Sequence, residues 1–465
     1  MYIRKLKINN LRRLRDVPLS FTLPDGSPRM WTVLIGENGS GKTSILQAIA
    51  LAAAGGLRVN DLAGSSFAHL VDRRQKDDLK IEAEFEFTPS SCSNHKAHPS
   101  IEKSKLGENL KLISEVKLKP KETSIIAKAR YGYEDDFPDS DNNPLTIARS
   151  KELPHWFVIG YGVQRFLPES GRVPDLARPS VDRMKPLFDS SYPLTSTSFL
   201  SYFGQKKKAL AYSKILKSAI INTDVLPNDI NDLEMRGQGG VSKASDLLER
   251  NRFHQKMGKD IVQIPGMALA HGYQSTIAWI ADLVGHILLE AESANMNPEE
   301  FEGLVLIDEI DLYLHPKWQA RLIPALRTTF PKLQFIATTH SPVALAALSP
   351  SEIIRVQSDP RTGDVRQVTP DSETGIWDEI DKPQDLYTQP DPRLMTGTEL
   401  FNEYFGLDRL TLNVHGEEIR NYSALASNPA RNEYQQAKMQ QLKAILLANN
   451  IHDLVEPVPR QDVDD

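Results

Sequence analysis

The nine residues from Gly36 to Ser44 constrain the fold of this chain more than any other segment. They read Gly-Glu-Asn-Gly-Ser-Gly-Lys-Thr-Ser and match the phosphate-loop pattern G-x-x-x-x-G-K-[ST]. The apolar run Trp31–Ile35 leads into this loop, and an alanine- and leucine-rich segment, residues 43–54, follows it. Glycines allow backbone amides to turn inward around phosphate oxygens, where Cβ atoms would not fit. The order strand, loop, helix therefore predicts an α/β fold that binds a phosphorylated ligand.

The polar residues of this loop have different expected roles. Lys42 would place its positive charge against the β and γ phosphates, and Thr43 would offer its hydroxyl to Mg²⁺. The other candidate contacts to the nucleotide are Gly36, Asn38, Gly39, Gly41 and Ser44. The alternative is a chance match in a glycine-rich loop, and the flanking strand and helix argue against it. We therefore expect ATP and Mg²⁺ as ligands.

Two apolar runs far downstream end in residues that would complete such a site. Leu304–Ile307 leads into the paired carboxylates Asp308 and Glu309, and Phe335–Thr339 ends at His340. Such runs are typical of central strands in a parallel sheet, which is covered on both faces. Adjacent residues of an extended chain point in different directions, so Asp308 can hold the metal while Glu309 orients the attacking water. His340 can hydrogen-bond the γ-phosphate; the alternatives are solvated acids at a strand end and an ordinary core or surface histidine.

Composition narrows the class of protein. The chain has 465 residues, a formal net charge of −6 and one cysteine, Cys92. The length allows two or three structural units, and the charge argues against a globally basic nucleic-acid coat. One cysteine excludes a disulfide within the chain, which fits a reducing compartment. No apolar run reaches the ~20 residues that span a bilayer, and the N-terminus lacks a signal-peptide core. We expect a cytoplasmic protein with no membrane partner.

The hydrophobic pattern divides the chain into a split core, an insertion and an extension. The expected elements are strands within residues 1–35, an antiparallel sheet within 79–133, a strand at 156–161, helices around 205–220 and 242–258, an amphipathic helix around 277–288, strand–helix units at 304–328 and 333–348, and helices around 398–406 and 431–448. The expected domains are a head made of residues 1–165 and 262–370, a mainly helical insertion 166–261, and a C-terminal extension 371–465.

The segment Asp308–Gln319 reads D-E-I-D-L-Y-L-H-P-K-W-Q. It resembles the Walker B and D-loop stretch of the ABC-type ATPase heads of Rad50, RecF and the OLD ATPases, and Thr338–Pro342 resembles their switch-histidine segment. The resemblance covers about residues 1–60 and 262–350. It implies a two-lobed P-loop NTPase, with a mixed-β N-terminal lobe and a parallel-sheet core, whose heads form a head-to-tail homodimer or a higher homo-oligomer around ATP.

The same resemblance implies residues that act across such a dimer. Asp311 and His315 would lie near the partner's nucleotide. The alternative for Asp311 is that it caps the helix expected to start near Pro316, and the two roles are compatible. The signature loop would be residues 269–275, with Gly272 and Ser275 as candidate nucleotide contacts. Ala270 stands where the family usually has serine, and His271 and Ser275 are the candidates to replace the missing hydroxyl.

Three further residues are weaker candidates for nucleotide contacts. Gln164, beside Arg165, would be the glutamine of the family's glutamine loop, and a surface glutamine is the alternative. Arg12 and Arg13 fall where related heads place basic residues near the base or phosphates, but they would equally suit solvated strand positions.

The lysine run Lys206–Lys208 could contact nucleic acid or form a solvated helix face.

The chain carries no recognisable second catalytic centre in its sequence. Beyond residue 370 we find no carboxylate set of the kind that the OLD nuclease domain needs. The layout is similar to the ATPase subunits of bacterial anti-phage systems such as Septu, including its retron-associated form, and PARIS. This resemblance implies a separate nuclease or toxin effector, with residues 396–405 as the candidate partner surface or, alternatively, a helix that packs on the head. A DNA-repair ATPase of the RecF or Rad50 type is the alternative function.

Overall fold

The computed structural model describes residues 1–72, 74, 77–92, 98–139, 142–165, 178–192, 194, 206–223, 225, 230–234, 252–269, 271–359, 361–368, 391–405, 415–449 and 451. The chain divides into two compact units, Met1–Leu400 and Phe401–Asp465. The domain boundary expected at residue 371 lies outside the described residues.

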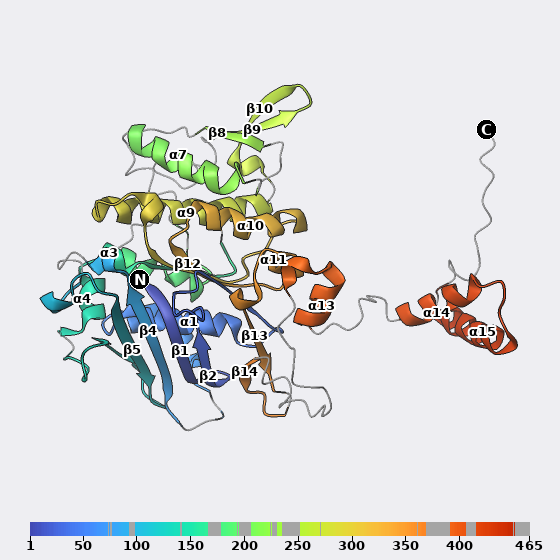
Figure 1. Cartoon of the computed structure of the whole chain (residues 1–465), viewed down its shortest axis with the longest axis horizontal. Coiled ribbons are helices and arrows are strands. Elements are labelled where there is room, and N and C mark those ends of the chain that lie inside the picture. The colour runs from blue at the N-terminus through green and yellow to red at the C-terminus, as the bar shows by residue number, and fades with distance from the viewer. Residues whose placement is uncertain are drawn as a thin grey trace. The chain divides into compact units, whose positions relative to one another are not determined.

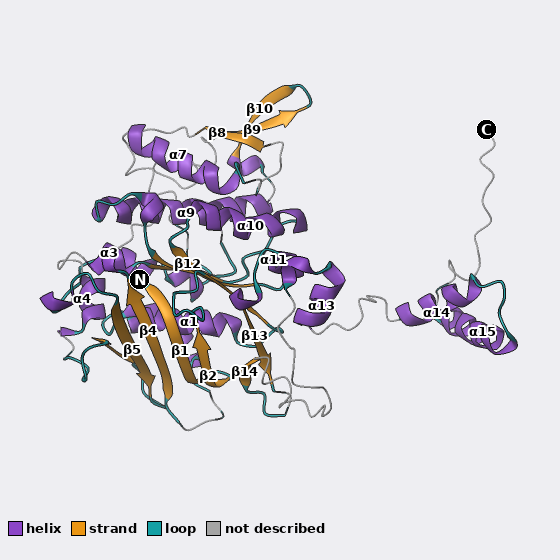
Figure 2. Ribbon diagram, viewed as in Figure 1, coloured by secondary structure: helices purple, strands orange, loops and turns teal. Residues whose placement is uncertain are grey.

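Eleven strands of the described residues form one sheet in the first unit (Figures 1 and 2). Their bounds are β1 (Tyr2–Leu11), β2 (Leu14–Ser20), β3 (Trp31–Ile35), β4 (Leu79–Phe87), β5 (Leu110–Leu118), β6 (Ile126–Tyr131), β7 (Val158–Tyr161), β11 (Gly303–Ile307), β12 (Leu333–Thr338), β13 (Ile353–Ser358) and β14 (Val365–Val368). Their order across the sheet is β6-β5-β4-β1-β2-β14-β13-β3-β12-β11-β7. The sheet therefore mixes strands from both ends of this unit.

The sheet has two parts with different strand directions. Strands β6, β5, β4, β1 and β2 pair antiparallel, whereas β13, β3, β12, β11 and β7 pair parallel. Strand β14 joins the parts, because it pairs antiparallel with β13 and parallel with β2. This arrangement confirms a mixed-β N-terminal lobe beside a parallel core. Strands β13 and β14 have no counterpart among the predicted elements.

Helix α1 (Lys42–Ala54) is buried along nearly its whole length. Its alanines and leucines belong to a cluster that includes residues of β1, β4 and β5 as well as Leu304 of β11 and Ile336 of β12. A helix that is apolar around its circumference must be covered on all sides. Gly55 ends it, as expected from the sequence. The first turn of α1 therefore starts from a rigid position between the two lobes.

Helices α9 (His271–Ser293) and α10 (Pro316–Thr329) form a second helical layer, and α7 (Lys206–Ile220) packs on the outer side of this layer, as Figure 1 shows. Two hydrogen bonds tie α9 to its neighbours. Tyr161, at the end of β7, donates its hydroxyl to Asp282 Oδ2 at 2.8 Å, and Tyr212 of α7 donates to the Ala281 carbonyl at 3.0 Å. The other α-helices that lie wholly in the described residues of this unit include α2 (Val59–Ala63), α3 (Pro89–Cys92), α4 (Pro144–Ser150), α5 (Pro179–Asp182) and α11 (Pro342–Leu345). Helix α9 is thus anchored on one side to a core strand.

The insertion contains a small sheet where a helix was expected. Strands β8 (Ile230–Glu234), β9 (Arg252–Met257) and β10 (Asp260–Pro265) form an antiparallel sheet. The predicted helix around 242–258 is therefore wrong for residues 252–257, and residues 242–251 lie outside the described part. Gly258 has a φ of 66° and joins β9 to β10 with Lys259 in a two-residue turn. Glycine at that position is a hairpin signal that outweighs a weak helical pattern.

In the second unit, α14 (Gly416–Ala426) packs against α15 (Glu433–Ala448) around Tyr422, Met439, Leu442 and Leu446. Asn432 and Gln435 cap the start of α15 reciprocally, a capping box that fixes where this helix begins. Helix α13 (Gly397–Phe405) spans the boundary between the two units. Helices α13 and α15 match the predicted ranges, whereas α14 was not predicted. Among the described helices, none combines the length and apolar character that crossing a bilayer requires.

Candidate nucleotide site

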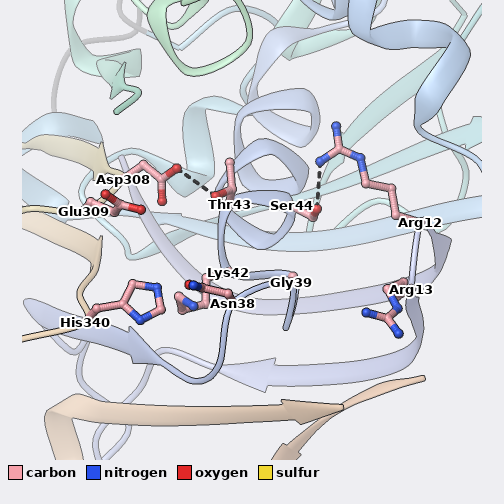
Figure 3. A pocket seen from close by; sticks show the side chains of 11 residues that line it. Arg12, Arg13, Asn38, Gly39, Lys42, Thr43, Ser44, Asp308, Glu309 and His340 are labelled. Atoms are coloured by element: carbon pink, nitrogen blue, oxygen red, sulfur yellow. Dashed lines mark hydrogen bonds between the residues drawn. The ribbon is translucent and has the colours of Figure 1, made fainter. Parts of the chain in front are cut away.

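The phosphate loop meets the ends of β11 and β12 at one pocket of about 320 Å³ (Figure 3). The residues that line it are Arg12, Arg13, Asn38, Gly39, Gly41, Lys42, Thr43, Ser44, Asp308, Glu309 and His340. These strands are parallel, so the residues that follow them gather at one edge of the sheet. The three segments singled out in the sequence therefore converge on one site.

The loop backbone is shaped to surround a ligand. Gly39 and Gly41 have φ values of 80° and 82°, a conformation that other residues adopt at a cost. A Cβ on Gly36 would lie 2.1 Å from the carbonyl oxygen of Val356 in β13. The hydroxyl of Ser40 is buried without a hydrogen-bond partner in the described residues, which leaves a polar atom for a ligand to satisfy. No side chain caps the start of α1, so its first amides can meet an anion.

Lys42 is buried, with 7% of its surface exposed. Its amine donates hydrogen bonds to the carbonyls of Gly36 at 2.8 Å and Glu37 at 2.9 Å. Burial lowers the pKa of Lys42, while the carboxylates of Asp308 and Glu309 oppose this shift. A phosphate would compete with two neutral carbonyls for this cation, and its negative charge would make it the stronger partner.

Asp308 connects the phosphate loop with the parallel core. Thr43 Oγ1 donates to Asp308 Oδ2 at 2.7 Å (Figure 3), and Thr338 Oγ1 donates to Asp308 Oδ1 at 2.7 Å. Thr43 and Asp308 are 265 positions apart in the sequence. A hydroxyl and a carboxylate are the hard oxygen ligands that Mg²⁺ prefers. These two groups fit a magnesium ion bound to a nucleotide.

Glu309 leaves the end of β11 in a left-handed backbone conformation, with φ at 48°. Its N–H donates to Thr338 Oγ1 at 2.7 Å. Burial raises the pKa of Glu309, and the carboxylates of Asp308 and Asp311 raise it further, against the opposing charges of Arg165 and Lys42. A carboxylate with a raised pKa is a stronger base, which suits a residue that accepts a proton from water.

His340 lies on the side of the pocket where Figure 3 also shows Glu309. Burial lowers the pKa of His340, and the charge of Lys42 lowers it further. The ring is therefore held neutral near pH 7, with one nitrogen as donor and one as acceptor. A neutral donor can hydrogen-bond a phosphate oxygen at this position.

Two arginines also line the pocket. Arg12 donates to Ser44 Oγ at 2.9 Å, as Figure 3 shows, and its backbone φ is 52°. The Arg13 guanidinium lies near Gly39, 3.7 Å from where a Cβ would stand. Both side chains therefore face the loop and not only solvent.

The structure does not bring Gln164 into the pocket. Gln164 is exposed, and its neighbour Arg165 is buried behind Asp308 and Glu309. Arg165 donates to the carbonyl oxygens of both acids, at 3.0 Å for Asp308. The sequence does not decide which of two adjacent polar residues in a loop turns inward. Thr338 is a second residue without a predicted role of its own, although it is the first residue of the segment that resembles the switch-histidine segment.

The residues expected to act across a dimer lie outside this pocket. The Asp311 carboxylate accepts a hydrogen bond from Thr339 Oγ1. The capping alternative for Asp311 is wrong, because the N-cap of α10 is His315, whose Nδ1 accepts from the Lys317 N–H at 3.3 Å.

In the predicted signature loop, His271 begins α9 and Gly272 follows within that helix, whereas Ala270 lies outside the described residues. Ser275, in the same helix, is buried. Ser275 does not line the pocket of its own chain.

Two family models match the chain. One, described as "AAA ATPase domain", matches residues 1–156, and the other, described as "AAA domain, putative AbiEii toxin, Type IV TA system", matches residues 241–346. The two matches contain the phosphate loop and the Asp308–His340 segment respectively. The fold and the arrangement of the site are those of an ABC-type ATPase head.

Similar proteins include a Septu protein and a probable retron ATPase. The Septu protein PtuA of Bacillus mycoides (strain KBAB4) is 28% identical over 449 residues, which cover 95% of this chain and 50% of that protein. The "Retron Ec83 probable ATPase" of Escherichia coli is 42% identical over 95 residues, or 20% of this chain and 17% of that protein. The chain thus spans about half the length of the first of these curated relatives.

A solved structure titled "Crystal structure of the SmcHead bound to the C-winged helix domain of ScpA" aligns with 79% of this chain and 97% of its own, at 15% identity and a TM-score of 0.46.

Proposed function

We propose that this chain binds ATP with Mg²⁺ at the candidate nucleotide site and hydrolyses it to ADP and phosphate. The observation that supports this most directly is the hydrogen bond between Thr43 and Asp308, inside a pocket that Lys42 also lines. Thr43 and Asp308 would hold the Mg²⁺, which when bound neutralises charge on the β and γ phosphates. Gly39, Gly41 and the first amides of α1 would surround the phosphates.

Each of the other residues of the pocket would have its own role in binding or hydrolysis. Lys42 would exchange the carbonyls of the loop for phosphate oxygens. Glu309 would accept a hydrogen bond from the attacking water and orient it, for which its carboxylate must come within about 3 Å of the water. His340 would donate to the γ-phosphate, and so distinguish ATP from ADP. Asn38, Ser44, Arg12 and Arg13 would add contacts around the triphosphate.

We further propose that ATP joins two heads in a head-to-tail dimer. Asp311 would then contact the partner's nucleotide, which agrees with its place outside the pocket of its own chain. Gly272, in the first turn of α9, would contact it as well. Ser275 is buried, so its hydroxyl does not face a partner in this conformation. The Tyr273 ring packs on the Trp318 ring at 4.9 Å, so the start of α9 and the start of α10 are in direct contact. The predicted signature and D-loop segments therefore belong to one continuous region, as a shared dimer surface requires.

The dimer would regulate a separate nuclease or toxin in anti-phage defence. The names of the Septu and retron relatives support this class of role. Helix α13 would be part of the partner surface, with packing on the head as the alternative. The side chains of Lys206–Lys208, proposed from the sequence to contact nucleic acid, lie outside the described part of the chain.

Glu309→Gln tests the mechanism. It should bind ATP, hydrolyse it slowly and accumulate as an ATP-dependent dimer, because the water would lose the carboxylate that orients it. Lys42→Ala, which removes the central cation, is the control and should bind no ATP. Bound nucleotide is measured by filter binding, turnover by phosphate release, and mass by light scattering with and without ATP. A Glu309→Gln protein that stays monomeric and releases ATP as fast as wild type would contradict the mechanism.

A further inference from the structure

Arg165 is a cation placed where burial is costly. Only 2% of its surface is exposed, and removing a charge from water costs several kcal/mol unless polar groups receive it. Its Nη2 donates to the carbonyls of Asp308 and Glu309, and its Nε has no hydrogen-bond partner in the described residues. Arg165 does not line the nucleotide pocket. Its described hydrogen bonds therefore all go to the backbone that carries the two acids.

The backbone at Glu309 needs such support. A left-handed conformation costs a non-glycine residue about 1 kcal/mol or more, and Glu309 adopts it at φ 48°. A residue held in this way can relax to a more favourable conformation when its restraints are removed. The Glu309 side chain would then point elsewhere.

The two peptide groups on either side of Glu309 are held at all four of their polar atoms. On the first peptide, Arg165 binds the Asp308 carbonyl and Thr338 Oγ1 accepts from the Glu309 N–H. On the second, Arg165 binds the Glu309 carbonyl, and the Ile310 N–H donates to the Thr338 carbonyl at 2.9 Å. Strand β12 thus supplies the restraint on the N–H side and Arg165, which follows β7, supplies it on the carbonyl side.

We propose that Arg165 is a positioning residue that fixes the direction of the Glu309 carboxylate for hydrolysis. The proposal rests on the proposed ATPase function. Arginine suits this task better than lysine, because its planar guanidinium loses less conformational freedom for each bond that it forms. Arg165 acts through Glu309, so its loss should reduce turnover and leave ATP binding in place.

The test compares Arg165→Met and Arg165→Lys with a matched control. Arg149 is a second buried arginine, 1% exposed, that also donates to backbone carbonyls, at 2.9 Å for Ala53 and 2.7 Å for Trp156. Arg149→Met therefore measures what the loss of a buried arginine does to folding alone. It should lower the thermal midpoint and leave kcat per folded molecule near the wild-type value.

For Arg165→Met we expect kcat to fall about 100-fold, the size of loss that a misplacement of about 1 Å causes. The Kd for ATP, measured with a fluorescent analogue, should stay within about threefold, because no pocket contact is removed. Arg165→Lys keeps the charge in the core and should lose kcat about 10-fold with a near wild-type thermal midpoint. If Arg165→Met does not fold, the kcat and the Kd for ATP of Arg165→Lys test the proposal in its place.

A double-mutant cycle with Glu309→Gln separates positioning from a general structural role. If Arg165 acts through Glu309, Arg165→Met should not further reduce the residual turnover of Glu309→Gln. The proposal is overturned if the methionine change costs the same factor in both backgrounds, or if it raises the Kd for ATP as much as it lowers kcat. Wild-type protein that releases no phosphate would instead refute the ATPase function itself, and with it the role of Arg165.

Discussion

Replacing Thr43 with valine removes one hydroxyl from the centre of the nucleotide site and keeps the shape of the side chain. This hydroxyl donates to Asp308 Oδ2 at 2.7 Å, and 3% of Asp308 is exposed. A hydrogen bond to a buried charged group contributes about 1.5–3 kcal/mol. Asp308 keeps the bond from Thr338 at its other oxygen, so we expect the variant to fold with a reduced thermal midpoint.

The same change should weaken the contribution of Mg²⁺ to ATP binding. Loss of 1.5–3 kcal/mol corresponds to about a 10- to 150-fold weaker affinity. We expect this loss when ATP is titrated calorimetrically with Mg²⁺ and little change when EDTA is present, because Thr43 would bind the metal. Thr43→Ser keeps the hydroxyl and should behave like wild type. The assignment of Thr43 as a metal ligand would be refuted if ATP binding depended on Mg²⁺ equally in the valine variant and in wild type. It would also be refuted if the serine and valine variants lost the same amount of ATP affinity.

Two further predictions concern buried polar groups outside the nucleotide pocket. Glu290→Gln neutralises the ion-pair partner of Arg183, whose side chain is fully buried. The change should lower the free energy of unfolding by about 3–5 kcal/mol, because it leaves a buried charge without its partner. Denaturant unfolding measures this loss, and an unchanged midpoint would contradict it. Burial lowers the pKa of His98 from 6.5 to about 4, so between these pH values the unfolded chain binds a proton that the folded chain does not, and stability falls as the pH falls. Between pH 7.5 and pH 5, the free energy of unfolding of wild type should fall by about 2 kcal/mol more than that of His98→Gln. Thermal melts at the two pH values measure this difference, and equal losses of stability in the two proteins would show that His98 does not contribute.

The parts of the fold that the sequence predicts well are those where local pattern and burial agree. The apolar runs that became β3, β11 and β12 are buried at every residue, so each is visible without knowledge of its neighbours. Strands β13 and β14 are short and half polar, and only their pairing partners make them strands. Pairing between distant segments leaves no local signal, which is why the link between the two lobes was not predicted.

The residues of the nucleotide site also fall into those that the sequence predicts and those that it does not. Residues of the pocket follow apolar strands or stand in a glycine-rich loop, and such patterns can be read from one sequence. The role of Arg165 depends on which way a loop turns after β7, and the role of Thr338 depends on the distance between two strand ends. Both are properties of the assembled sheet. The start of α10 at Pro316 agrees with the sequence prediction, and it makes the residue directly before it, His315, the N-cap in place of Asp311.

The strand order has a consequence for synthesis on the ribosome. Strand β3, which carries the phosphate loop, pairs on its two edges with β12 and β13, and both are translated roughly 300 residues after it. At about 5–20 residues per second, the nascent chain would hold a strand that the folded protein buries at every residue, with two open edges, for roughly 15–60 seconds. Any product that terminates before residue 333 would lack both of these neighbours. Such a fragment would expose the edges of β3 to aggregation and would have an incomplete nucleotide site, so we expect chaperones or proteases to remove it.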